Sequence, residues 1–353
     1  MRALSLALTR PRGVVPRAHY PKRPIDGILI LHRGENPSTD YYLRPRLAGA
    51  GTPACIADLG SSPDDCPLLR PDGPSALLVV FCRYASSAWL DAVEAARGRL
   101  ARVAFFMDDD LPAMMRDPDL PGTARGKVAL HFAAHAARLS GLSSELWVST
   151  AVLAERYAEA GAALLCPLPE APPPEPSAAP ARRVVYHATD VHDRERQFVL
   201  EVARRTAERD PGLVFEIVGD EALRRAAEGL ANVEIAPQRA WPEYRAAQTP
   251  GRASISLAPL WPSPVNDARA PVKVFDAARL GAVGLYADAE AYRSFVRDGE
   301  DGLLLPMTVD AWTKAILDLA ADPAGRLRMA QSARARLQGL LAASPVLPDA
   351  ATA

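Results

Sequence analysis

A lysine and an aspartate three residues apart form the pair whose types and spacing point most directly to chemistry. Lys273 and Asp276 lie in a stretch with helical character, where side chains three apart share a face and can meet one ligand. The ammonium group of Lys273 suits a diphosphate, and the carboxylate of Asp276 suits the vicinal hydroxyls of a ribose. The pair therefore predicts a site for a sugar nucleotide.

The residues around this pair predict elements that would hold it at the edge of a sheet. We expect a buried strand over 254–258, a helix over 271–280 and a second strand over 283–287. Pro271 fits the first helical turn, where its missing N–H would have no partner, and Gly281 fits the left-handed position after the helix. This places the pair at the carboxyl end of a strand, where open α/β sheets bind ligands and where helix N–H groups attract anions.

A second polar segment follows the strand predicted over 183–188. Thr189, His192 and Asp193 stand there, directly before the helix expected over 193–208. A loop histidine facing a ligand can donate a hydrogen bond to phosphate or sugar oxygens. Asp193 has an alternative role, because an aspartate at this position can simply cap the following helix.

Three consecutive carboxylates, Asp108 to Asp110, follow a buried strand in the first half of the chain. Carboxylates this close are costly to bury unless they meet solvent, cations or hydrogen-bond donors. Asp108 and Asp110 are candidates to position an acceptor hydroxyl, one of them as a base. A solvated turn is the alternative interpretation.

Two other groups of residues have the types of metal ligands but not the pattern. His131 and His135 are four apart in the helix predicted over 125–140, yet no third ligand stands at metallopeptidase spacing, which favours one face of an amphipathic helix. The four cysteines are scattered without metal-ligand spacing. We expect no metal and no cofactor, and a reducing cytoplasm as the location.

Length and composition indicate a globular protein with two domains. The chain has 353 residues, 49% of them hydrophobic and 24% charged. The net charge of −1 argues against a nucleic-acid partner, which usually requires a concentrated positive field. No stretch reaches the roughly 20 apolar residues of a membrane-spanning helix.

Short apolar runs alternate with helical patterns along both halves, which predicts mostly parallel sheets covered on both faces. In the first half, strands are expected over 27–32, 53–59, 76–82, 102–107 and 145–149, with helices over 40–48, 86–98, 125–140 and 150–160. Dense proline between the halves predicts a semi-rigid extended spacer. The predicted organisation is a basic arm (1–24), a first domain (25–168), a proline-rich linker (169–181), a second domain (182–340) and a tail (341–353).

Several motifs of the second half resemble the donor-binding segment of GT-B glycosyltransferases, and more narrowly of glycosyltransferase family 4 (group 1). They comprise Ala258-Pro-Leu, Asn266 to Arg269, Pro271-Val-Lys273, Asp276 to Gly281 and Asp298 to Leu304. The resemblance is strongest over 182–336 and fainter over 26–168. It implies two Rossmann-like α/β domains with parallel sheets facing a central cleft, the first for the acceptor and the second for the nucleotide-sugar donor.

The resemblance also implies an activity and roles for residues. The protein would be a hexosyltransferase-like enzyme that moves a sugar from a nucleotide sugar to a glycan or other hydroxyl acceptor, with retention and without metal, in surface polysaccharide or glycoconjugate synthesis. Lys273 would neutralise the charge on the leaving diphosphate, and His192 would be a second catalytic residue that contacts phosphate or sugar oxygens. The donor would contact Thr189, His192, Asp193, Asn266, Lys273 and Asp276. The element at Asp108 to Asp110 has a counterpart on the cleft side of the family's first domain. A D-x-D metal site, as in GT-A enzymes, is disfavoured by the double α/β organisation.

Two departures from the family pattern keep other functions open. Ala188 replaces a glycine, and Ala268 replaces the first acidic residue of the family's Glu-x7-Glu motif, of which Asp276 is the second. A degenerate relative that binds a nucleotide or glycan within an assembly is the main alternative, and a sugar-nucleotide epimerase is a third.

Two weaker expectations concern the first half of the chain. Arg33, Asn36 and Tyr41 follow the first predicted strand and are candidates to touch the acceptor. Basic residues of the arm are candidates for a weak association with the inner membrane surface, namely Arg10, Arg12, Arg17, Lys22 and Arg23.

Overall fold

The computed structural model describes residues 13–47, 51–179, 182–189, 191–343 and 347. The chain forms two compact units, one ending at Cys166 and the other beginning at Pro167; they are called the N-terminal and the C-terminal unit below. Residues 344–346 and 348–353 of the predicted tail lie outside the described residues, as do Arg10 and Arg12 of the predicted arm. No helix of the described part is long and apolar enough to cross a membrane.

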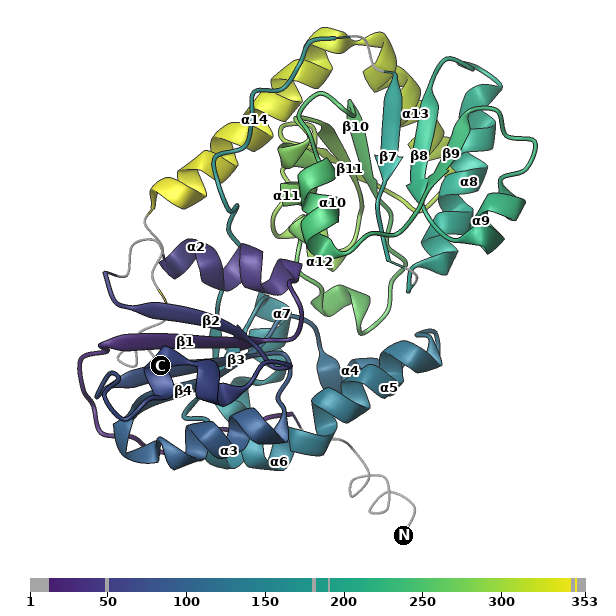
Figure 1. Ribbon diagram of the computed structural model, residues 1–353. Helices are drawn as coiled ribbons and strands as arrows, with labels where there is room; N and C mark the ends of the chain where they lie inside the picture. Colours follow the sequence, from purple (N-terminus) through teal and green to yellow (C-terminus); the bar gives the residue numbers. More distant parts are fainter. Residues whose placement is uncertain (1–12, 48–50, 180–181, 190, 344–346, 348–353) are drawn as a thin grey trace. The chain divides into compact units, whose positions relative to one another are not determined.

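The N-terminal unit contains a six-stranded parallel sheet with the order β2-β1-β3-β4-β5-β6. Its strands are β1 (Gly27–His32), β2 (Ala54–Asp58), β3 (Leu77–Cys82), β4 (Leu100–Met107), β5 (Glu145–Val148) and β6 (Ala162–Leu164). Strands β1 to β4 are labelled in Figure 1. The central strands β1 and β3 are buried along their whole length, as expected for continuous apolar runs covered on both faces. Five of the six strands were predicted; β6, a three-residue edge strand, was not.

Helices connect these strands. They are a π-helical turn (Thr39–Leu43), α2 (Arg44–Leu47), α3 (Ser87–Ala95), α4 (Leu111–Met114), α5 (Gly122–His131), α6 (Ala136–Leu142) and α7 (Ala151–Arg156), with 3-10 turns at Pro63–Asp65, Pro67–Leu69, Arg97–Arg99, Ala133–His135 and Ala158–Ala160. The single helix predicted over 125–140 is wrong. It breaks at Phe132, a fully buried side chain stacked on Phe105, so His131 and His135 do not share one helix face.

The described part of the predicted basic arm packs against the N-terminal unit. Val14 is 1% exposed, the amide of Arg17 donates to the carbonyl of Ser140 (2.9 Å), and the hydroxyl of Tyr20 donates to the carbonyl of Leu142 (2.6 Å). These contacts satisfy carbonyls at the end of α6 that have no partner inside the helix. Residues 14–20 of the predicted arm are therefore held against the rest of this unit.

The C-terminal unit contains a second six-stranded parallel sheet, with the order β12-β11-β10-β7-β8-β9. Its strands are β7 (Arg183–Tyr186), β8 (Val214–Val218), β9 (Val233–Ala236), β10 (Ile255–Ala258), β11 (Val283–Ala287) and β12 (Leu303–Leu305). The strand order reverses between β7 and β10, because β8 lies on one side of β7 and β10 on the other. Open α/β sheets bind ligands at the carboxyl ends of strands at such a switch point.

Helices cover both faces of the second sheet (Figure 1). They are α8 (Asp193–Ala207), α9 (Glu221–Ala226), α10 (Trp241–Ala247), α11 (Val272–Arg279), α12 (Glu290–Arg293), α13 (Val309–Ala321) and α14 (Pro323–Ala342), with a 3-10 turn at Asn266–Ala268. Side chains of β7 alternate between the faces: Val184 and Tyr186 enter the large apolar core with α8 and α13, while Val185 packs with Leu280 on the other face.

The proline-rich segment between the units is bound to the C-terminal unit rather than free as a spacer. Arg334 of α14 donates to the carbonyl of Pro173 (2.9 Å) and pairs with Glu175 (2.9 Å), while Arg245 of α10 pairs with Glu170 (2.7 Å). Proline leaves carbonyls without local partners, and arginine side chains of the helices supply the donors.

Gly281 is the glycine whose replacement tests this packing most sharply. It follows α11 with a φ of 66°, as predicted for a left-handed residue at the helix end, and a Cβ there would lie 3.2 Å from Cα of Pro176. We predict that Gly281→Ala lowers the free energy of unfolding by about 1–2 kcal/mol or more, the cost of a left-handed non-glycine residue. Chemical denaturation measures this change.

The matched control is Gly339→Ala, inside α14, where a Cβ meets no atom within 4 Å. Alanine is favoured over glycine by roughly 0.5–1 kcal/mol inside a helix, so this variant should be stabilised. Equal effects of the two substitutions would contradict the account of Gly281.

Candidate functional site

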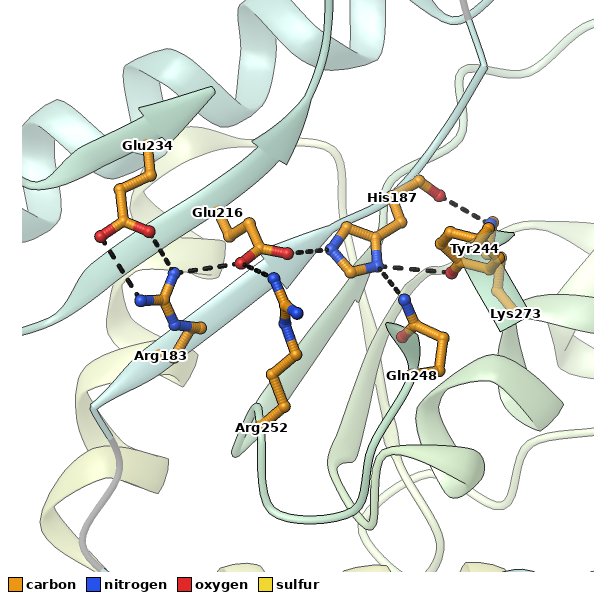
Figure 2. A network of polar contacts seen from close by, with 8 residues as sticks. All are labelled: Arg183, His187, Glu216, Glu234, Tyr244, Gln248, Arg252 and Lys273. Carbon is orange, nitrogen blue, oxygen red and sulfur yellow. Dashed lines mark hydrogen bonds and ion pairs between the residues drawn. The ribbon is translucent and has the colours of Figure 1, made fainter. Parts of the chain in front are cut away.

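Lys273 lies at the switch point of the second sheet, in the first turn of α11. Its Nζ donates to the carbonyl of His187 at the end of β7 (2.6 Å), as Figure 2 shows. It also pairs with Asp276 Oδ2 (3.1 Å). The Lys273 side chain is 29% exposed and that of Asp276 is 7% exposed. An ammonium group has three donors, so two fixed partners leave one N–H direction for a ligand. The predicted pairing of Lys273 with Asp276 on one helix is present.

His187 joins Lys273 to a buried polar network (Figure 2). Its Nε2 lies 3.0 Å from Glu216 Oε1, and its Nδ1 lies 3.3 Å from the hydroxyl of Tyr244 and 3.4 Å from Gln248 Nε2. The ring is therefore held from both nitrogens. Because the ring is fixed, the carbonyl of the same residue, which accepts from Lys273, is fixed as well.

Glu216 is a carboxylate in the middle of β8 and only 5% exposed. Besides His187 it pairs with Arg183 (3.1 Å) and Arg252 (2.7 Å). The hydrogen bond from His187 lowers the pKa of Glu216 to about 2, against the opposing effect of burial and with the help of Arg252. Sequence reasoning missed this network; the signal was a single glutamate inside the apolar run Leu213 to Val218.

A second cation stands near Lys273. Arg269 Nη1 lies 2.9 Å from His192 Nε2, and His192 Nδ1 lies 3.7 Å from Glu195 Oε2. Burial lowers the pKa of His192, and the nearby Arg269 lowers it further. The imidazole is thus neutral, with Nε2 accepting from Arg269 and the proton on Nδ1 facing Glu195. Arg269 Nε is buried without a hydrogen-bond partner among the described residues.

The other predicted donor residues lie close by but differ in surroundings. Asn266 donates to the carbonyl of Trp261 (2.8 Å), which shapes the loop before α11. Thr189 and Asp193 are both exposed, and Asp193 is the first residue of α8. The structure therefore brings Lys273, Asp276 and His192 to one end of the second sheet, with Arg269 as a residue that was not predicted to act there.

In the N-terminal unit, one arginine compensates two of the three consecutive carboxylates. Arg83 pairs with Asp108 (3.0 Å) and with Asp109 (3.1 Å), and it adopts a φ of 66° at the end of β3. Burial raises the pKa of Asp108, against the opposing effect of Arg83. A φ this positive is uncommon for a residue with a side chain and places the guanidinium between the two aspartates.

Asp110 has a structural position distinct from that of Asp108. It accepts from the Ala113 amide (2.9 Å) as the N-cap of α4, accepts from the Tyr157 hydroxyl (2.7 Å), and pairs with Arg156. With a 2% exposed fraction it is not open to a substrate hydroxyl. A solvated turn, the alternative interpretation of this segment, does not describe Asp110.

Of the weaker acceptor candidates, Tyr41 is 1% exposed and belongs to the core, while Asn36 accepts from the Thr39 amide (3.1 Å) at the start of the π-helical turn. Arg33 is exposed.

In the part of the chain that the structure describes, no group of three or more His, Cys, Asp or Glu residues could hold a metal ion.

A comparison with family models gives a match within the C-terminal unit. Residues 181–322 match the family model described as "Glycosyl transferases group 1", which identifies the C-terminal unit as a glycosyltransferase domain. The predicted resemblance is thereby confirmed at the level of the group. A comparison with curated proteins gives no match.

Solved structures share the two-domain GT-B fold, which confirms the predicted fold class. HepE from Anabaena in complex with UDP has a TM-score of 0.52 and 15% identity, over 90% of this chain and 97% of HepE. Sucrose-phosphate synthase from Thermosynechococcus elongatus has a TM-score of 0.54 and 16% identity, over 90% of this chain and 95% of the synthase. TarM from S. aureus has a TM-score of 0.53 and 10% identity, over 76% of this chain and 54% of TarM. The chain thus spans about half the length of TarM.

The network around Glu216 generates a prediction for stability and pH. Because the pKa of Glu216 is lowered to about 2 in the folded protein, its contribution is present above the ordinary glutamate pKa and is lost as pH falls from about 4.5 toward 2. Glu216→Gln should cost on the order of 3 kcal/mol at pH 7, since each tenfold change in proton affinity is 1.36 kcal/mol. The difference from the wild type should shrink in that acid window.

Glu234→Gln is the matched control, since Glu234 pairs with the same Arg183 but its side chain is 56% exposed. An exposed pair contributes about 0–1 kcal/mol. Denaturant unfolding at pH 7 and pH 3 distinguishes the two variants. An equal, pH-independent loss in both would contradict the role assigned to Glu216.

Proposed function

We propose that this protein is a glycosyltransferase that moves a sugar from a nucleotide-sugar donor, bound by the C-terminal unit, to a glycan or other hydroxyl acceptor. The observation that carries the proposal is Lys273. Its ammonium group is fixed by a backbone carbonyl and by Asp276 at the switch point of the sheet, and it remains partly exposed. The match of residues 181–322 to glycosyl transferases group 1 supports the same conclusion.

The proposed chemistry is stabilisation of the leaving diphosphate. Charge grows on the diphosphate as the bond to the sugar breaks, and preorganised cations at that position lower the barrier. Lys273 supplies one cation, and Arg269 supplies a second through its donors that do not face His192. Neutral His192 orients Arg269 and, unlike an imidazolium, does not repel it.

Asp276 takes two roles in this proposal. One oxygen holds Lys273, and the carboxylate also accepts from the ribose hydroxyls. Aspartate is one methylene shorter than the glutamate of the family motif, so the nucleotide approaches closer or a water bridges the gap. Thr189, Asn266 and Asp193 complete the donor loop.

On the acceptor side, we favour Asp108 over Asp110 as the group that positions a hydroxyl. Asp110 is committed to the N-cap of α4 and to Arg156 and its side chain is 2% exposed, whereas the Asp108 side chain is 12% exposed. Retention of configuration, metal independence and a place in surface polysaccharide or glycoconjugate synthesis are further parts of the proposal. So are a cytoplasmic location and a weak association with the membrane surface.

The competing proposal is a degenerate protein that binds a nucleotide or glycan without turnover. The observation that favours it is Ala268, which is fully buried and offers no carboxylate where the family has one. Release of nucleoside diphosphate from a panel of nucleotide sugars, followed by mass analysis, distinguishes the two. Turnover with one donor supports the enzyme, whereas a thermal shift with a nucleotide but no turnover supports the binding protein.

Lys273→Met tests the donor site. Turnover should fall roughly 10²–10³-fold, the scale for loss of one preorganised charge-stabilising group. Asp276 also loses its cation, so the variant should be less stable by about 1–3 kcal/mol. Adding Asp276→Asn to Lys273→Met should restore much of that stability without restoring turnover, which separates the chemical role from folding.

Lys314→Met is the matched control. Lys314 also pairs with an aspartate one helical turn away, Asp318, but the Lys314 side chain is 74% exposed on α13. Its turnover and stability should remain at wild-type values. Full activity of folded Lys273→Met would remove the basis for the donor site.

Metal independence is tested separately with a chelator. Arg83 already supplies the cation between Asp108 and Asp109, so a divalent ion would have to displace it. We predict that turnover stays within about twofold after EDTA, as for catalysis that does not use a metal as Lewis acid. Loss of activity with EDTA and recovery with Mn²⁺ would instead indicate a D-x-D metal site.

A further inference from the structure

A cavity of about 250 Å³ lies at the amino end of the second sheet, the end opposite to Lys273. It is formed where β7 and β10 begin, beside the start of α14 and the end of the proline-rich segment. Four arginines line it: Arg182, Arg183, Arg252 and Arg326. Neither the family match nor the donor site explains such a concentration of guanidinium groups.

The charges in this cavity do not balance. Arg183 and Arg252 are compensated by Glu216 and Glu234. Arg182, which is exposed, has no carboxylate partner among the described residues. The charges of Arg183 and Arg252 are thus balanced by two carboxylates, and the positive charges of Arg182 and Arg326 remain in excess.

Arg326 is the more unusual of these two residues, because it is only 2% exposed. Its Nη atoms donate to the carbonyls of Leu319 (2.7 Å) and Ala179 (2.5 Å), not to a carboxylate. Burial lowers the pKa of Arg326, with only a partial opposing effect from Asp322. A buried cation without a bound anion is costly, and a ligand of opposite charge would remove that cost.

We propose that this cavity binds a phosphate group, either inorganic phosphate or a small phosphomonoester. Guanidinium forks match the oxygens of a phosphate and form charge-assisted hydrogen bonds in pairs. The enclosed volume suits an anion of that size and excludes a whole nucleotide sugar. Ser254 also lines the cavity and has a hydroxyl that can donate to a phosphate oxygen.

The cavity is linked to the donor site through side chains that are in contact. Arg252 of the cavity donates to Glu216, Glu216 contacts the ring of His187, and the carbonyl of His187 accepts from Lys273 (Figure 2). A phosphate that attracts Arg252 weakens its bond to Glu216, which then depends more on His187. Phosphate in the cavity therefore changes nucleotide affinity at Lys273. This second step rests on the proposed function; the binding of phosphate does not.

The binding test is titration calorimetry of the full chain with inorganic phosphate and, separately, glycerol 3-phosphate, at constant ionic strength. Arg182→Glu should weaken binding at least tenfold, since it replaces a charge-assisted donor by a like charge. Arg70→Glu, the same charge reversal on an exposed residue of the N-terminal unit, should leave it unchanged. The stronger of the two anions identifies whether the cavity takes the free ion or an ester.

Lys273→Met separates the cavity from the donor site, which also attracts phosphate. Binding that persists in Lys273→Met and is lost in Arg182→Glu supports the cavity. Binding that is lost in Lys273→Met and persists in Arg182→Glu, equal losses in Arg182→Glu and Arg70→Glu, or no binding at all would overturn the proposal.

The coupling test measures the Kd of a nucleoside diphosphate with and without saturating glycerol 3-phosphate. The Kd should change at least threefold in the wild type and not in Arg182→Glu, because linkage requires the two ligands to affect each other equally. An unchanged Kd in the wild type would overturn the link to Lys273. A protein that binds phosphate but no nucleotide would contradict the proposed function and leave the anion site in place.

Discussion

The C-terminal unit depends on the compensation of one buried charge. A carboxylate in the middle of a parallel strand is costly to dehydrate, and it is retained only where several donors converge on it. Glu216 meets this condition through Arg183 at the start of the neighbouring strand, Arg252 in the loop before β10, and His187 at the end of β7. Arg183 and His187 lie at the two ends of β7 and Arg252 belongs to a segment far from it in sequence, so the charge fixes how β7, β8 and the loop before β10 lie against one another. The apolar cluster of Val185 and Leu280 completes the same face.

The position of Lys273 follows from that arrangement. A lysine side chain is long and flexible, and it becomes a precise electrostatic group only when its partners are fixed. The carbonyl of His187 is such a partner because both ring nitrogens of the residue are held. On the opposite side of the site, neutral His192 plays the corresponding part for Arg269. The two cations thus have separate supports, one buried in the sheet and one in the loop that begins α8.

The sequence predicted the alternation of strands and helices because long apolar runs and helical periods are local signals. It failed where the signal was short or depended on distant residues. The edge strands β6 and β12 have three residues each and are partly exposed, so their apolar runs are too short to indicate a strand. The break at Phe132 arises from a side chain that enters the core, which the periodicity of 125–140 does not reveal. Lys273, Asp276 and His192 were found from spacing and resemblance, whereas His187 and Glu216 were not, because nothing local links a strand glutamate to a histidine 29 residues away.

The attachment of the proline-rich segment to α10 and α14 has a consequence for how such chains can be recombined. Arg334, Arg245 and Arg326 bind the segment through its backbone and its glutamates, so residues 167–179 are structurally a part of the C-terminal unit. A chimera that joins this unit to a different partner must therefore be cut at Cys166. A joint placed after the prolines would import a foreign segment and leave three arginines facing groups that they do not fit.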